Sequence, residues 1–366
     1  VNFAELEKQP GDEPRPLISQ LSILDDHPEQ VPCHITHTNP STHSIIEENL
    51  KRSAMYSGNI SGVGPRYCPS IEDKISRFSG KQSHQIFVEP EGLSTRELYP
   101  NGISTSLPFD VQVDFVRTIK GFEAAEIIRP GYAIEYDYFD PTGLYHSLET
   151  KEVEGLFFAG QINGTTGYEE AAAQGLLAGA NAALKVQSKS LWEPGREQAY
   201  LGVMVDDLIN LGTDEPYRMF TSRAEFRLRL REDNADQRLN QTGNELGLIG
   251  EARNRVYQTK MKNMRTLEEK LSREKIKPSS GAEQKLGITL EKEVDILSLL
   301  KRSDVTFEKL ESLVDESEKL LLRQIETEQK YAGYIKRQDV EIEKIRRHEA
   351  MKIPPNIDFL KMEALS

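Results

Sequence analysis

Residues 157–175 read Phe157-Phe-Ala-Gly-Gln-Ile-Asn-Gly-Thr-Thr-Gly-Tyr-Glu-Glu-Ala-Ala-Ala-Gln-Gly175, and the fold class rests on this run. It begins in a short apolar stretch, Val153 to Ala159, which predicts a buried strand. Gly160 to Gly167 is a glycine-rich turn, and the alanine-rich residues from Tyr168 to Leu184 predict a helix. The sequence therefore predicts a strand, a glycine turn and a helix in succession.

A glycine turn at a helix N-terminus presents free backbone N–H groups and the positive end of the helix dipole. This arrangement suits an anionic or electron-rich cofactor edge, such as a phosphate or a flavin. A tight turn whose glycines serve only packing is the alternative. Gly62-Val-Gly64 lacks the third glycine of a dinucleotide fingerprint, and no other Gly-x-Gly-x-x-Gly turn opens a strand-helix-strand unit.

The residues on either side of this unit differ in pattern. On the N-terminal side, β-branched and aromatic runs at Gln30–His37, His84–Glu89 and Ile127–Tyr138 predict a mixed or antiparallel sheet, interrupted by one helix over Pro108–Gly121. On the C-terminal side, apolar residues repeat at helical spacing over Glu251–Lys275 and about Glu316–Glu349. For these two charged helices a solvated outer face is a better interpretation than a charged binding surface.

Length and composition narrow the functional classes. The chain has 366 residues, which suggests two or three domains, and its formal net charge of −13 excludes attraction of nucleic acid or anionic membrane by bulk charge. No apolar run approaches the roughly 18 residues of a membrane span, so we expect a soluble protein. Two cysteines, Cys33 and Cys68, are too few for a disulfide scaffold or a four-thiolate zinc site.

Cys68 lies in the segment Gly64-Pro-Arg-Tyr-Cys-Pro-Ser-Ile-Glu-Asp-Lys74. The nearby cations Arg66 and Lys74 favour the nucleophilic thiolate. Ser70 to Asp73 resembles a capping box, which predicts a helix N-terminus close to Cys68. The positive end of that helix would also lower the pKa of the Cys68 thiol. A small buried cysteine in a turn is the alternative.

Cys33, His34, His37 and His43 raise the possibility of a metal site, because thiolate and imidazole are ordinary zinc ligands. On a strand, however, Cys33 and His37 share one face while His34 points to the other. The sequence supplies no matching second pair of ligands. We therefore predict no metal site.

An arginine-rich segment extends from Tyr217 to Asn234 in this otherwise acidic chain. Its cations are Arg218, Arg223, Arg227, Arg229 and Arg231, with Tyr217, Phe220 and Phe226 between them. Arginine binds phosphate through its bidentate fork and stacks on splayed bases, which predicts an RNA-binding patch. The alternative is a solvated surface on which these arginines pair with Glu225, Glu232, Asp233 and Asp236.

These segments, with Tyr99–Phe109 and Arg129–Tyr136, closely resemble the glucose-inhibited division protein A family, the MnmG-type tRNA uridine modification enzymes. The similarity covers almost the whole chain. It implies an α/β plus α fold class: part of a two-dinucleotide-binding-domain flavoprotein, in which a Rossmann-like FAD domain carries an inserted mixed β domain and is followed by a helical domain. The order of the segments matches the central and following part of that family, so we expect a fragment that lacks the N-terminal FAD fingerprint and the extreme C-terminus.

The resemblance also implies a domain division. Residues 1–150 would form the inserted, mostly β domain on the NAD and substrate side, with adjoining strands of the FAD domain. Residues 151–190 would be the returning strand, turn and helix of the FAD-binding domain. Residues 191–366 would belong to the helical, tRNA-binding C-terminal region.

The function implied by the resemblance is an FAD- and NADH-dependent enzyme that installs a carboxymethylaminomethyl or aminomethyl group at carbon 5 of the wobble uridine of certain tRNAs. Methylene-tetrahydrofolate would supply the one-carbon unit. The implied partners are tRNA and an MnmE-type GTPase that forms a heterotetramer with a homodimer of this protein, with no membrane. The expected location is the bacterial cytoplasm, or alternatively the mitochondrial matrix. A catalytically silent RNA-binding or scaffold protein derived from this family is the alternative function.

Carried over residue by residue, the resemblance assigns Cys68 as a catalytic nucleophile and Gln161 as the flavin contact. Cofactor binding is expected at Gly160, Gln161, Asn163, Gly164, Gly64, Pro65, Arg66, Tyr67, Ser70, Lys74 and Phe78. The tRNA contacts are expected at Arg218, Arg223, Arg227, Arg229 and Arg231.

Overall fold

The computed structural model describes residues 1–13, 15–17, 19, 21–22, 27–58, 70–349 and 351–352. The chain divides into two compact units. The first consists of Val1–Trp192 and Asp207–Met219, and the second of Glu193–Asp206 and Phe220–Ser366. The division at residues 150 and 190 that the resemblance implies stays a prediction.

The first unit contains an antiparallel sheet whose four strands are neighbours in chain order. They are β1 (Glu7–Gln9), β2 (Cys33–His37), β3 (Gln85–Pro90) and β4 (Leu98–Asn101). Ile86 and Val88 of β3 are buried while Gln85 is exposed, which is the alternation expected of a sheet with one covered face. The antiparallel sheet predicted from the sequence is therefore confirmed.

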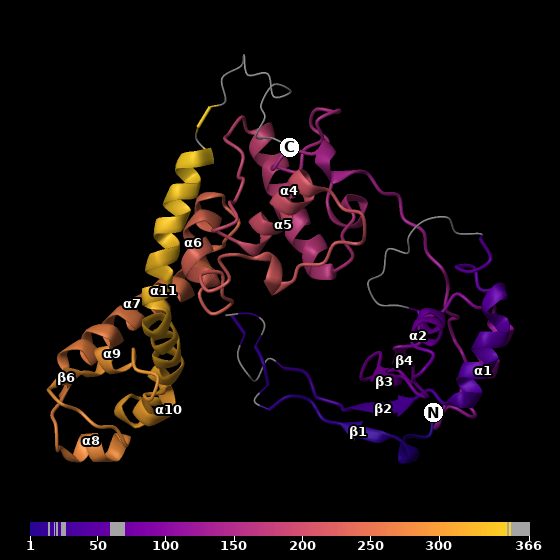
Figure 1. Ribbon diagram of the computed structural model, residues 1–366, viewed down its shortest axis with the longest axis horizontal. Coiled ribbons are helices and arrows are strands. Elements are labelled where there is room, and N and C mark those ends of the chain that lie inside the picture. Colours follow the sequence, from indigo (N-terminus) through magenta and orange to yellow (C-terminus); the bar gives the residue numbers. More distant parts are fainter. Residues whose placement is uncertain are drawn as a thin grey trace, which may run out of the picture. The chain divides into compact units, whose positions relative to one another are not determined.

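Two helices lie beside this sheet in Figure 1, α1 (Pro40–Asn49) and α2 (Ile71–Arg77). A third helix, α3 (Phe109–Val116), belongs to the same unit. Both α2 and α3 pack against α1. The α2 helix begins with a capping box in which the Ser70 hydroxyl accepts from the Asp73 backbone N–H and the Asp73 carboxylate accepts from the Ser70 N–H, as predicted. The shared apolar core contains Ile46, Ile71, Ile75, Ile86, Val88, Phe115 and Ile119.

Two predicted strands are not formed. Ile127–Tyr138 has no regular secondary structure. At Gly131 a side chain occupies the backbone groups that a neighbouring strand would bind: the Gly131 N–H donates to Gln112 Oε1 at 2.7 Å and Gln112 Nε2 donates to the Gly131 carbonyl at 2.9 Å. Val153–Ala159 forms only an isolated bridge, between Glu149 and Phe157. Both runs have strand-like composition, but no ladder forms along them in the described part of the chain.

The glycine turn leads into α4 (Tyr168–Val186), as predicted, and α5 (Tyr200–Leu211) follows. The α5 helix belongs to both units, because the first unit resumes at Asp207. Apolar residues of α4 and α5 are buried, among them Leu177, Leu184, Val203 and Leu208.

The second unit is helical, apart from a short antiparallel pair, β5 (Lys275–Ile276) with β6 (Val294–Asp295). Its helices are α6 (Ala235–Glu245), α7 (Glu251–Arg273), α8 (Gly281–Leu286), α9 (Ile296–Leu299), α10 (Phe307–Leu310) and α11 (Lys319–Glu349). The long α11 runs past α6 and α7 in Figure 1. The apolar stripe of α7, formed by Met264, Leu267 and Leu271, meets Leu322 and Ile325 of α11 in one core. The two long helices predicted from periodicity are confirmed.

Candidate functional site

The glycine turn has backbone geometry that requires its glycines. Residues Gly160–Asn163 form a short 3₁₀ helix, η5, and both Gly160 and Gly164 have positive φ angles, of 87° and 81°. A Cβ atom on Gly164 would lie 2.6 Å from Thr213 Oγ1 and 2.9 Å from the Tyr138 ring. The turn therefore brings backbone close to its neighbours in a way that no larger residue permits.

Gln174 of α4 holds this turn in shape. Its Oε1 accepts from the Gly160 N–H at 3.1 Å and from Asn163 Nδ2 at 2.8 Å, and its Nε2 donates to Thr165 Oγ1 at 2.9 Å. All of these groups are buried, so each hydrogen bond offsets a desolvation cost. The turn is thus fixed by one amide side chain two helical turns into α4.

The same turn carries polar atoms that are not satisfied. Asn163 Oδ1, Thr166 Oγ1 and Glu170 Oε2 are buried and have no hydrogen-bond partner among the described residues. Because buried polar atoms are nearly always paired, such a cluster fits a ligand that brings polar groups to the turn. Gly167 caps α4 without any side-chain hydrogen bond, so the helix N-terminus lies at the same place.

Four of the predicted cofactor residues lie together here. Gly160, Gln161 and Asn163 belong to η5, and Gly164 follows as its C-cap. The Gln161 side chain is half-buried, and its carbonyl accepts from the Gly164 N–H at 2.9 Å. The structure therefore brings these four residues to one turn, beside the unsatisfied atoms.

The other predicted cofactor residues fall into two groups. Ser70, Lys74 and Phe78 lie together on α2 and at its end, where Lys74 Nζ donates to the Gly102 carbonyl at 2.8 Å and the Phe78 ring is exposed. Gly64, Pro65, Arg66, Tyr67 and Cys68 lie outside the described residues.

Cys33 and the nearby histidines do not form a ligand set. No group of three or more His, Cys, Asp or Glu side chains suited to a metal ion occurs in the described ranges. Burial, with a smaller contribution from Glu89, raises the pKa of the Cys33 thiol. His43 Nε2 lies 2.7 Å from the Thr38 hydroxyl, so its ring is used in packing β2 against α1.

Three of the five predicted tRNA-binding arginines are held by partners. Arg218 Nε donates to the buried Glu170 Oε1 at 3.2 Å. Arg229 pairs with Asp339 of α11. Arg231 pairs with Asp233 at 2.9 Å, donates to the Leu228 carbonyl at 2.8 Å and lies over the Tyr331 ring, and its side chain is only 12% exposed.

The other two arginines differ in exposure. Arg227 is exposed, and no carboxylate in the described part of the chain forms an ion pair with it. Arg223 ends a short 3₁₀ turn, Thr221–Arg223, and is half-buried. The structure therefore distinguishes the exposed Arg227 from the four half-buried arginines, and Arg231 has one of the carboxylates, Asp233, that the surface alternative predicted.

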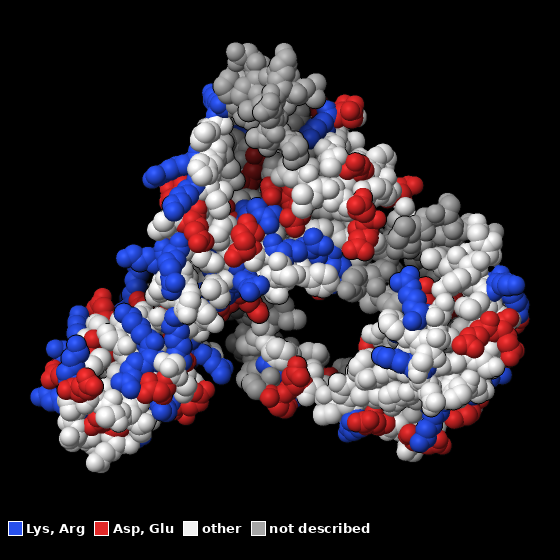
Figure 2. Space-filling model, in the orientation of Figure 1, with Lys and Arg blue, Asp and Glu red and all other residues white. Residues whose placement is uncertain are grey.

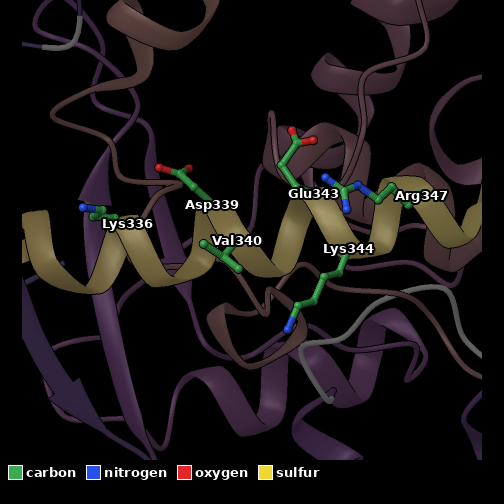
Figure 3. Close-up of a pocket in the computed structure, with 6 residues that line it drawn as sticks. All are labelled: Lys336, Asp339, Val340, Glu343, Lys344 and Arg347. Carbon is green, nitrogen blue, oxygen red and sulfur yellow. The ribbon is translucent and has the colours of Figure 1, made fainter.

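A shallow hollow runs along the exposed side of α11. Figure 3 shows the residues that line it: Lys336, Asp339, Val340, Glu343, Lys344 and Arg347, all from this one helix. Asp339 and Glu343 project to the same side, and Lys344 projects to the opposite side. Three cations and two carboxylates line it, so this surface has no single sign of charge.

Three residues that organise these sites were not predicted from the sequence: Glu170, Gln174 and Arg196. Arg196 forms a bidentate pair with Glu225, at 2.8 and 2.9 Å, and a second pair with Asp206 at 3.0 Å. One signal was available for Gln174: helical spacing places it on the same face of α4 as Leu177 and Leu184, which are buried. The partners of Arg196 are 10 and 29 residues away, so sequence spacing gave no signal for them.

Models of known protein families match residues in both units of this chain. The family model for glucose inhibited division protein A matches residues 1–190, and the model for the "tRNA modifying enzyme MnmG/GidA C-terminal helical domain" matches residues 251–339. The structure of Aquifex aeolicus GidA in its form II crystal is 41% identical, with a TM-score of 0.80, and its form I structure is 43% identical, with a TM-score of 0.81.

Both matches cover 100% of this chain, which spans 59% and 60% of the two Aquifex aeolicus chains. They confirm the predicted fold class, an α/β part followed by a helical domain. The family model covers more than half of the sequence, and the identity exceeds 40% over the whole chain. This chain therefore belongs to the glucose inhibited division protein A family.

Proposed function

We propose that this protein is an FAD- and NADH-dependent tRNA-modifying enzyme that installs the carboxymethylaminomethyl or aminomethyl group at carbon 5 of the wobble uridine. Methylene-tetrahydrofolate is the proposed one-carbon donor. Family membership supports the reaction class. The structural observation that carries the proposal is the set of unsatisfied buried atoms, Asn163 Oδ1 and Thr166 Oγ1, at a glycine turn that opens α4.

FAD is the ligand proposed for this turn. Gly160, Gln161, Asn163 and Gly164 would hold it, because an isoalloxazine ring has N–H and C=O groups along one edge that match unsatisfied side-chain atoms. When bound, FAD supplies the electron transfer that takes reducing equivalents from NADH. The glycines allow close approach of the backbone, and Gln174 keeps the turn from collapsing.

NADH is proposed to bind along the stretch from Gly64 to Phe78, which includes Pro65, Arg66, Tyr67, Ser70 and Lys74. Cys68 is the proposed nucleophile. Addition of its thiolate to carbon 6 of uracil forms a C–S bond and moves the electron pair of the C5–C6 double bond to carbon 5, which becomes nucleophilic. After substitution, loss of the carbon 5 proton and elimination of the thiolate restore the double bond.

The proposed RNA contacts are the five arginines Arg218, Arg223, Arg227, Arg229 and Arg231. Their exposure suggests that they do not contribute equally. Arg227 is available for phosphate, whereas Arg231 would have to leave Asp233 and the Leu228 carbonyl. We therefore assign direct contact first to Arg227, and a supporting role to the other four.

The proposed assembly is a homodimer that binds an MnmE-type GTPase in a heterotetramer. The proposed location is the bacterial cytoplasm, with the mitochondrial matrix as the alternative. Among the described residues, no helix is both long and apolar enough to cross a membrane.

A reconstituted reaction tests this function. The protein and its GTPase partner are incubated with tRNA, NADH, GTP, methylene-tetrahydrofolate and glycine or ammonium, and the wobble nucleoside is identified by mass spectrometry. Modified uridine is expected with the wild type and not with Cys68→Ser, which should keep the yellow flavin spectrum and tRNA affinity. A colourless protein that binds tRNA but leaves uridine unchanged would instead identify a silent RNA-binding protein.

A further inference from the structure

The first half of α7 is a second basic run in this acidic chain. Between Ala252 and Leu267 the sequence contains five basic residues and no acidic residue, although acidic residues outnumber basic ones 59 to 46 overall. Figure 2 shows Lys and Arg side chains gathered over the part of the second unit that contains α7 and α11.

The five basic residues have different environments. Lys260 is used internally, since its Nζ lies 2.8 Å from the buried carboxylate of Asp236 on α6 and its side chain is 23% exposed. Arg253 is exposed, one turn from the start of the helix. Arg255, Lys262 and Arg265 are exposed on the side opposite the buried stripe Met264, Leu267 and Leu271.

The exposed cations are poorly neutralised. Arg255 makes one ion pair, with Glu251 at 3.3 Å, and both side chains are more than 70% exposed, so the pair contributes little. Lys262 and Arg265 form no ion pair within the described ranges of the chain.

Between these cations the surface is polar but uncharged. Gln258, Thr259, Asn263 and Thr266 are exposed there, and both threonine hydroxyls donate to the backbone of their own helix. The helical rise places Arg255 about 10 Å from Lys262, and Lys262 about 5 Å from Arg265. The result is a row of three exposed cations, more than one helical turn long, in which only Arg255 has an ion-pair partner among the described residues.

We infer that this face of α7, formed by Arg255, Lys262 and Arg265, binds the phosphate backbone of an RNA helix. A row of separate, solvated cations fits a ligand that repeats its negative charge at regular intervals, and phosphates do so. Uncharged Gln, Thr and Asn side chains can hydrogen-bond to phosphate or ribose oxygens without repelling them. The inference rests on the proposed tRNA substrate and adds a second contact surface to the arginine segment.

Titration of RNA tests the inference without any modification step. A fluorescent RNA duplex of random sequence and a labelled tRNA are titrated with the full chain at several salt concentrations, and log K is plotted against log salt. The test variant is Lys262→Gln/Arg265→Gln. The control, Arg273→Gln/Lys285→Gln, also removes one Arg and one Lys that are exposed, but Arg273 is already paired with Glu269.

With the test variant, we expect duplex affinity at low salt to fall about tenfold and the salt slope to fall by about 2, because two phosphate contacts are lost. The control should change affinity less than twofold. Equal losses in the two variants, or no loss in either, would overturn the inference. So would intact RNA binding combined with lost binding of an acidic protein such as the partner GTPase.

The two proposals can fail separately. If the wild type modifies tRNA and the test variant binds RNA like the wild type, only the inferred RNA contact of α7 is wrong. If the test variant loses duplex binding while the wild type modifies no tRNA, only the proposed reaction is wrong. Thermal unfolding of both variants checks that the exposed substitutions leave the fold unchanged.

Discussion

Glu170 and Arg218 connect the glycine turn to the arginine segment. Glu170 is in the first turn of α4, and its buried Oε1 accepts from Arg218 Nε at 3.2 Å and from the Met219 N–H at 2.8 Å. The two side chains are 48 residues apart in sequence. One carboxylate therefore fixes both the start of the helix at the proposed cofactor turn and the start of the segment proposed to reach RNA.

Replacement of Glu170 by Gln keeps the shape of the side chain but removes its charge beside Arg218. Because Glu170 is 3% exposed and Arg218 only 31%, we expect the free energy of unfolding to fall by about 1–3 kcal/mol. Urea unfolding followed by circular dichroism measures the change. Glu169→Gln, on an exposed neighbour in the same turn, is the control, and equal midpoints for Glu170→Gln and the control would remove Glu170 from this role.

Alanine at Gly164 and at Gly175 should have opposite effects. Gly164 has a φ of 81°, and a Cβ there would lie 2.6 Å from Thr213 Oγ1, so we expect Gly164→Ala to lower the free energy of unfolding by about 2 kcal/mol or more. Gly175 lies inside α4 with nothing within 4 Å of an added Cβ, so Gly175→Ala should raise it by about 0.5–1 kcal/mol. Chemical denaturation measures the free energy of unfolding of both variants. Changes of the same sign in the two would contradict the described turn.

Stability should fall on mild acidification. Burial is the main cause that lowers the pKa of both His43 and His84, whose rings lie 5.4 Å apart. The unfolded chain then takes up protons near the ordinary histidine pKa of about 6.5, before the folded chain does. Unfolding therefore becomes easier as pH falls through about 6.5 toward the lowered folded pKa values.

Urea midpoints at pH 7.5, 6.5 and 5.5 measure this dependence. His84→Gln should flatten it, since one of the two buried rings no longer titrates. His37→Gln, an exposed substitution on β2, is the control for replacing a histidine outside this pair. A slope for His84→Gln as steep as that of the wild type would contradict the assignment to this pair.

The parts of the fold that were predicted correctly depend on local chemistry. Glycine conformations, alanine helix propensity, the Ser70–Asp73 capping box and the apolar periodicity of α7 and α11 all act over a few residues. The predicted strands at Val153–Ala159 and Ile127–Tyr138 were wrong because a strand needs a neighbour. In Ile127–Tyr138, the Gln112 side chain binds the backbone of Gly131, where a neighbouring strand would have bound.

The arginine segment shows why side-chain roles are harder to predict. Its composition indicated a basic patch, but the partners of Arg218 and Arg229 lie 48 and 110 residues away. Only folding places Glu170 and Asp339 beside them. Spacing along the sequence could find the pairing of Arg231 with Asp233 and no more.

The assignment of RNA contact to the exposed Arg227, and of a supporting role to the paired Arg231, is tested most directly by the salt dependence of tRNA binding. Wild type, Arg227→Ala and Arg231→Ala are titrated with labelled tRNA from about 50 to 200 mM salt. Arg227→Ala should lower the salt slope by about 1 with an unchanged thermal midpoint. Arg231→Ala should lower the thermal midpoint and leave the slope nearly unchanged. A wild-type slope in Arg227→Ala would contradict the assignment of this arginine to RNA.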